Sequence, residues 1–154
     1  MSKKEIQAQI EIDAPAEQVW DILTNFDDFR EWNTFIRPVV GRAEVGNKLR
    51  VQIRPPGGRP IAFQPRVTKV EPKKELRWQG HMWLQGLFDS EHIFTIEPLG
   101  PEKVRFVQRV IFSGMLVSVM ARNHAVNIRP GFRDMNQALK ERAEGTKVAG
   151  DKGR

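Results

Sequence analysis

Three histidines are the side chains of this 154-residue sequence most suited to acid–base or metal chemistry, because cysteine and tyrosine are both absent. His92 lies in a segment that alternates between apolar and polar residues, on the same side as Phe94. Gln108 has the same place in the next alternating segment. The period of two therefore predicts that His92 and Gln108 both face an apolar interior.

Three interpretations of the pair His92 and Gln108 remain open. The two side chains could hydrogen-bond the polar end of a ligand, or His92 could act as an acid or base near neutral pH. The third interpretation is a structural hydrogen bond across the two strands. No catalytic residue is assigned from the sequence.

His124 has an apolar setting of a different kind. It follows Met120 by four residues and precedes Ile128 by four, so it is predicted to face the same interior from a helix. A hydrogen bond to a backbone carbonyl or to water is the structural alternative. The three histidines match no metal-ligand spacing and thiolate ligands are lacking, so no metal site and no cofactor is expected.

The elements that position these residues can be read from hydrophobic periodicity. Residues 5–13 alternate as a strand, and a short amphipathic helix follows Pro15, with a second short helical turn after it. From just after Trp32 to residue 113 the chain shows a run of about six strands separated by turns. From Val117 to Leu139 apolar residues recur every three or four positions, which predicts one helix of about 26 residues. Pro130 falls inside it and predicts a kink near Val126.

This order of elements predicts an α+β helix-grip fold. A curved antiparallel sheet of about seven strands would wrap around the long C-terminal helix, with two short helices after the first strand. Such a sheet stands away from a straight helix, which leaves room for a small hydrophobic molecule. The residues predicted to contact it are Phe63, Trp78, His92, Phe94, Gln108, Val110, Met120, His124 and Ile128. We expect one domain over 1–144 and a flexible tail over 145–154.

Charge and hydropathy limit the other classes. The net charge is +6, but the last fifteen residues hold five basic and three acidic side chains, and the remaining charges are interleaved. No basic stripe or stacking motif supports specific nucleic-acid binding. No apolar run reaches the roughly 18 residues of a transmembrane helix, and no signal core follows Met1, so a cytoplasmic protein is expected. The sequence leaves the oligomeric state unknown.

Several short segments, taken in order, resemble the START-like superfamily in its polyketide cyclase/dehydratase branch, also called SRPBCC domains. The resemblance covers about residues 4 to 143 and rests on the segments Ala14-Pro15-Ala16-Glu17-Gln18-Val19-Trp20, Leu76-Arg77-Trp78, Gly86-Leu87-Phe88-Asp89, Phe112-Ser113-Gly114 and Met135-Asn136-Gln137-Ala138-Leu139. It implies the helix-grip fold and an internal cavity, and it names no catalytic residue.

Members of this superfamily differ in function, so the fold alone does not decide it. The leading hypothesis is binding or transport of a small hydrophobic ligand, either lipid-like or an aromatic metabolite. One alternative is a polyketide cyclase/dehydratase-type enzyme that uses a cavity histidine as acid or base. Another is a protein-interaction or stress-associated domain.

Overall fold

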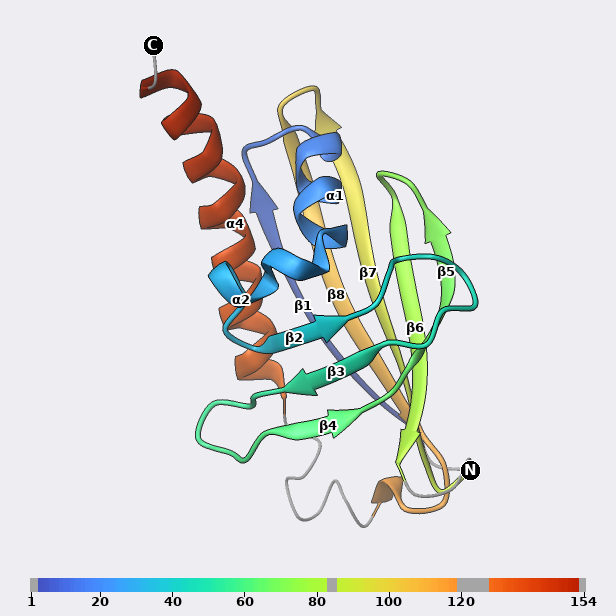
Figure 1. The fold of residues 1–154 in the computed structure, drawn as a ribbon. Helices are drawn as coiled ribbons and strands as arrows, with labels where there is room; N and C mark the ends of the chain where they lie inside the picture. The colour runs from blue at the N-terminus through green and yellow to red at the C-terminus, as the bar shows by residue number, and fades with distance from the viewer. Residues whose placement is uncertain (1–2, 83–85, 119–127, 153–154) are drawn as a thin grey trace.

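The computed structural model describes residues 3–82, 86–118 and 128–152, in an antiparallel α+β arrangement (Figure 1). The elements in chain order are β1 (Lys3–Ile12), α1 (Ala16–Thr24), the 3₁₀ turn η1 (Phe26–Asp28), α2 (Phe29–Trp32), β2 (Ile36–Val40), β3 (Arg50–Ile53), β4 (Ile61–Phe63), β5 (Arg66–Glu71), β6 (Glu75–Met82), β7 (Phe88–Gly100), β8 (Lys103–Ser113) and α4 (Arg129–Lys152). The predicted strand, short helices, run of strands and C-terminal helix are confirmed in that order.

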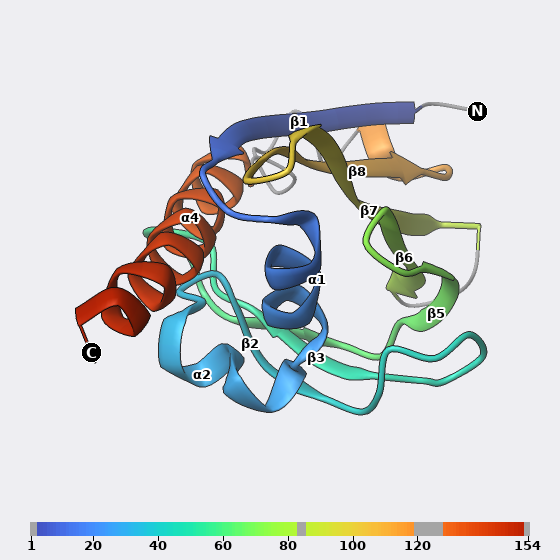
Figure 2. The same ribbon diagram turned by 90° about the horizontal axis from the view of Figure 1, so that it is seen from above.

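The strands form two antiparallel sheets. The first has the order β1-β8-β7-β6-β5 and the second the order β2-β3-β4. An isolated bridge between Lys48 and Arg66 joins them. Viewed from above, the five-stranded sheet curves around α1, while α4 lies along the β1 side and α2 lies beside β2 of the three-stranded sheet (Figure 2). The helix-grip prediction is thus confirmed, and the sheet is not closed.

Helix α4 begins later than its periodicity predicts. Ile128 is not helical, and Pro130 is the second residue of the helix, where a missing backbone N–H breaks no hydrogen bond. The prediction that Pro130 interrupts a helix running from Val117 is therefore wrong, and the predicted kink near Val126 lies outside the described residues. The helix continues to Lys152, through most of the segment 145–154, whose flexibility remains a prediction.

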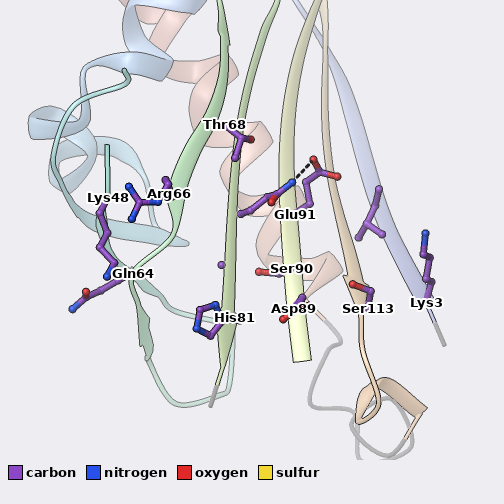
Figure 3. A pocket seen from close by; sticks show the side chains of 13 residues that line it. Lys3, Lys48, Gln64, Arg66, Thr68, His81, Asp89, Ser90, Glu91 and Ser113 are labelled. Carbon is purple, nitrogen blue, oxygen red and sulfur yellow. Dashed lines mark hydrogen bonds between the residues drawn. The ribbon is translucent and has the colours of Figure 1, made fainter. Parts of the chain in front are cut away.

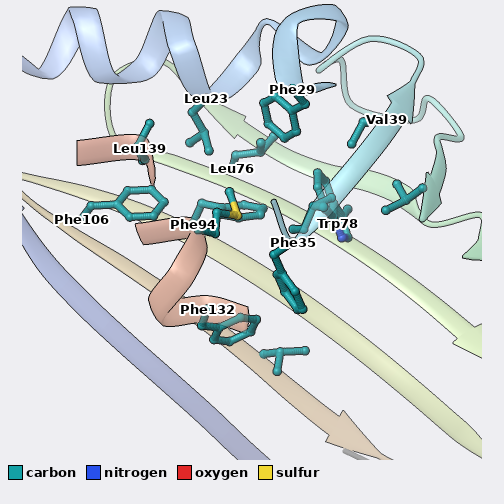
Figure 4. Packing of buried hydrophobic residues seen from close by; sticks show 14 of the residues in the cluster. Leu23, Phe29, Phe35, Val39, Leu76, Trp78, Phe94, Phe106, Phe132 and Leu139 are labelled. Atoms are coloured by element: carbon teal, nitrogen blue, oxygen red, sulfur yellow. The ribbon is translucent and has the colours of Figure 1, made fainter. Parts of the chain in front are cut away.

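Aromatic side chains fill the space between the sheets and α4. Figure 4 shows Trp78, Phe94 and Phe106 from the five-stranded sheet meeting rings and aliphatic side chains from the helices and the second sheet. Phe35, just before β2, packs edge-to-face on Phe132 of α4, with ring centroids 5.7 Å apart. That contact leaves no room for a side chain at Gly131, because a Cβ there would lie 2.9 Å from Cγ of Phe35.

One corner ties the end of β8 to the start of β7. The Leu116 N–H donates to the Leu87 carbonyl at 2.9 Å, and the Asp89 carboxylate accepts the Gly86 N–H at 3.0 Å. Gly114 has φ +119°, and a Cβ there would come within 2.6 Å of the Leu87 oxygen. Only glycine fits this close approach without strain. Of the described helices, none has the length and hydropathy needed to cross a membrane.

Candidate functional site

The centre of the sheet's inner face carries a buried chain of three polar side chains. His92 on β7 and Gln108 on β8 share this face, and His92 Nε2 lies 2.9 Å from Gln108 Oε1. Because an amide oxygen can only accept, His92 donates from Nε2. Gln108 Nε2 then donates to Asn136 Oδ1 on α4, also at 2.9 Å. Of the open interpretations, the structural cross-strand hydrogen bond is therefore confirmed.

Three aromatic rings surround the imidazole of His92. Phe94 stacks on it, with ring centroids 4.2 Å apart and an interplanar angle of 17°. Trp78 meets it edge-on at 5.4 Å, and Phe132 from α4 lies at 5.2 Å. The sheet and the helix thus supply apolar walls on several sides of one polar ring.

Burial determines the protonation state of His92. Desolvation lowers the pKa of His92 from 6.5 to about 3, and the hydrogen bond with Gln108 opposes this only in part. The ring is neutral at pH 7, so the interpretation that His92 titrates near neutral pH is wrong. The buried polar side chains in the described ranges are Asn33, His92, Gln108 and Asn136, and none is a carboxylate that could orient a catalytic histidine.

Two buried N–H donors near the polar chain of His92, Gln108 and Asn136 have no acceptor among the described residues. Trp78 Nε1 and Asn136 Nδ2 are without a hydrogen-bond partner among the residues that the structure describes. A buried donor left unpaired costs about 1–3 kcal/mol. The interior therefore has spare hydrogen-bond donors next to its aromatic rings.

Comparison with known proteins identifies the family. The family model described as "Polyketide cyclase / dehydrase and lipid transport" matches residues 3–144. The chain belongs to this family. A search of curated proteins found no match.

Solved structures support the same fold for this member of the polyketide cyclase and lipid-transport family. A START superfamily protein from Mycobacterium smegmatis is 20% identical, with a TM-score of 0.71 over 92% of this chain and 98% of that one. The Zhui aromatase/cyclase from Streptomyces sp. R1128 is 13% identical, with a TM-score of 0.74 over 93% and 94%. Norcoclaurine synthase from Thalictrum flavum is 15% identical, with a TM-score of 0.73 over 95% and 97%. At these identities the likeness concerns the fold.

The structure brings most of the predicted site residues to one inner face. Trp78, His92, Phe94, Gln108, Val110 and Ile128 are all buried, and Phe63 is half-buried. Met120 and His124 lie outside the described residues. Phe94 and Gln108 have no exposed surface, so the layer at His92 is closely packed. Phe63 lies toward the other end of the inner face, where it covers Gly80.

Asn136 is the member of the polar chain that sequence reasoning missed. It is 2% exposed, one helical turn after Phe132, so the helical period places it on the buried side of α4. Its partner Gln108 is 28 residues away in sequence, and no local pattern reveals such a contact. An asparagine at an otherwise apolar helix position was the one available signal.

Proposed function

We propose that this protein binds a small, uncharged hydrophobic ligand on the inner side of its five-stranded sheet. The observation that carries the proposal is the cluster of aromatic rings around a neutral His92 that is hydrogen-bonded to Gln108, with no buried charge among the described residues. Apolar walls with a few oriented polar groups are the usual make-up of a small-molecule site. Membership of a family described by ring-closing enzymes and lipid transport is consistent with such a ligand.

The ligand is proposed to enter at the end of the inner face formed by Phe63, Phe88 and Phe112. Phe88 and Phe112 stack at 5.1 Å there and keep slight exposure, 5% and 7%, whereas Phe94 and Phe106 deeper in the fold have none. From this end the ligand would extend toward Trp78 and His92, with the closely packed side chains there moving apart to admit it. A polar atom on the ligand would be an acceptor, because the unpaired buried atoms there are N–H donors.

The energetics suit binding without catalysis. A complex in which ligand and protein together bury about 450 Å² of apolar surface gains roughly 11 kcal/mol, of which association entropy offsets about 4 kcal/mol at the low end of its range. Micromolar affinity is the expected result. The enzyme alternative is not favoured, because His92 is neutral and no buried carboxylate assists it in the described residues.

A fluorescence titration with the neutral apolar probe N-phenyl-1-naphthylamine tests the proposal. We expect saturable micromolar binding to the wild type and a severalfold weaker affinity for Phe63→Ala. Val70→Ala is the matched control, because Val70 is also half-buried against the core but lies near the β5–β6 turn, at the opposite end of the sheet. Absence of saturable binding, or equal affinities for the two variants, would refute the proposal.

A further inference from the structure

A groove of about 510 Å³ crosses the outer face of the five-stranded sheet, on the side opposite His92 (Figure 3). Most of the residues that line it carry polar side chains, with Ile111 as the one large apolar side chain. Strand alternation explains this position, because Gln79 and Glu91 point outward while their neighbours Trp78 and His92 point inward. The groove is therefore distinct from the proposed ligand site.

Strand register places the groove's charges in order. One cross-strand row runs from Lys48 through Arg66 and Gln79 to Glu91. The neighbouring row runs from His81 through Asp89 and Ser113 to Lys3. Since adjacent strands lie about 4.8 Å apart, Lys3 on β1 is about 19 Å from Arg66 on β5. The two ends of the groove are thus separate positive regions with carboxylates between them.

Lys48 and Arg66 have no carboxylate partner among the described residues, unlike several arginines of the outer face. Elsewhere on this face Arg77 pairs with Glu91, Arg109 with Glu5 and Arg105 with Glu97. By contrast, Lys48 and Arg66 are direct cross-strand neighbours, and neither forms an ion pair within the described ranges. Like charges opposite each other destabilise a sheet. Two adjacent positive charges are therefore kept here at a cost.

We propose that Lys48, Arg66 and His81 form a binding site for a phosphate-type anion. The guanidinium of Arg66 is held by one bond to the Gly46 carbonyl at 2.6 Å, which leaves most of its five N–H donors for a ligand. The Lys48 ammonium adds a second charge, and His81 lies two residues from the Arg66 partner Gln79 on the same face of β6. The planar guanidinium of Arg66 and the ammonium of Lys48 can together bind the several oxygens of a phosphate group.

The anion is carried by a larger molecule in this proposal. A groove of about 510 Å³ exceeds what one phosphate needs, and its middle offers carboxylate acceptors for hydroxyl or amino groups. Two sources have this chemistry, a free phosphorylated metabolite and a phospholipid headgroup. Both would bring the same group to Lys48 and Arg66.

Calorimetric titration with inorganic pyrophosphate at low ionic strength, where screening is weak, tests the site. We expect saturable binding of one anion, weakened about fivefold or more by Lys48→Gln and by Arg66→Gln, since each removes a charge-assisted hydrogen bond. These exposed side chains support no core contact, so the variants should fold normally. Lys3→Gln is the matched control, because it removes the same charge from the far end of the same groove and should change the affinity less than about twofold.

A second measurement distinguishes the sources. Co-sedimentation with phosphatidylglycerol vesicles shows whether a lipid headgroup is the carrier, and saturable pyrophosphate binding without vesicle binding indicates a free metabolite. Selective loss in Lys48→Gln and Arg66→Gln in either assay supports the site. Equal weakening by all three variants would reveal general charge attraction and overturn the proposal, as would the absence of binding in both assays.

Discussion

Replacement of Gly131 by alanine tests the packing of α4 on the rest of the fold. The new Cβ would meet three ring carbons of Phe35, the least close of them at 2.9 Å. Phe35 is 1% exposed and is held edge-to-face by Phe132, so its ring has little room to move. Overpacking of this kind costs about 1–3 kcal/mol, and the higher helix propensity of alanine returns up to about 1 kcal/mol. We expect a net loss of about 1–2 kcal/mol.

The same substitution at Gly145 should act in the opposite direction. Gly145 is in the same helix, and a Cβ there would have no heavy atom within 4 Å. Gly145→Ala should therefore stabilise the protein by about 0.5–1 kcal/mol through helix propensity alone.

Urea denaturation of both variants compares their free energies of unfolding. In thermal denaturation, the Tm of Gly131→Ala should fall by roughly 3–6 °C. In a Phe35→Ala background, Gly131→Ala should cease to destabilise because the obstructing ring is gone. If Gly131→Ala were as stable as the wild type, the close approach of α4 to Phe35 would be refuted.

Two further predictions concern the buried polar chain. Gln108→Leu leaves His92 Nε2–H and Asn136 Oδ1 without partners, so it should lower the free energy of unfolding by about 2–5 kcal/mol, measured by urea denaturation. The triple variant His92→Phe, Gln108→Leu and Asn136→Leu should lose less stability than the sum of the three single variants. Additive costs would show that the three side chains are independent. Because the pKa of His92 falls from 6.5 to about 3 on folding, the unfolded chain binds the proton in that pH window. The contribution of His92 to the free energy of unfolding is therefore fully present above pH 6.5, and it declines by about 1.4 kcal/mol per pH unit toward pH 3. Denaturation at pH 7 and pH 5 should show a shallower decline for His92→Phe, and an unchanged decline would contradict a buried neutral ring.

Regular alternation made the inner face of the sheet predictable. A period of two assigns every residue of β7 and β8 to one face or the other, which is why the sequence alone places His92 and Gln108 on the same face. The same kind of argument failed at the start of α4. Apolar residues recur with helical spacing on both sides of Ile128, but periodicity contains no information on where a chain changes direction, and Pro130 fits a first helical turn as well as a kink.

The amino-acid sequence by itself determined the order of elements, the apolar character of the inner face and the absence of thiolate chemistry, because these depend on local pattern and composition. Tertiary structure decided the rest. The protonation state of His92 depends on how completely Trp78, Phe94 and Phe132 exclude water from it, and its hydrogen-bond chain ends on a helix 28 residues beyond Gln108. Likewise, Lys48 and Arg66 become neighbours only where the two sheets meet. Contacts between residues distant in sequence determine the burial, hydrogen bonds and neighbouring charges of these side chains, and a linear pattern contains no information on such contacts.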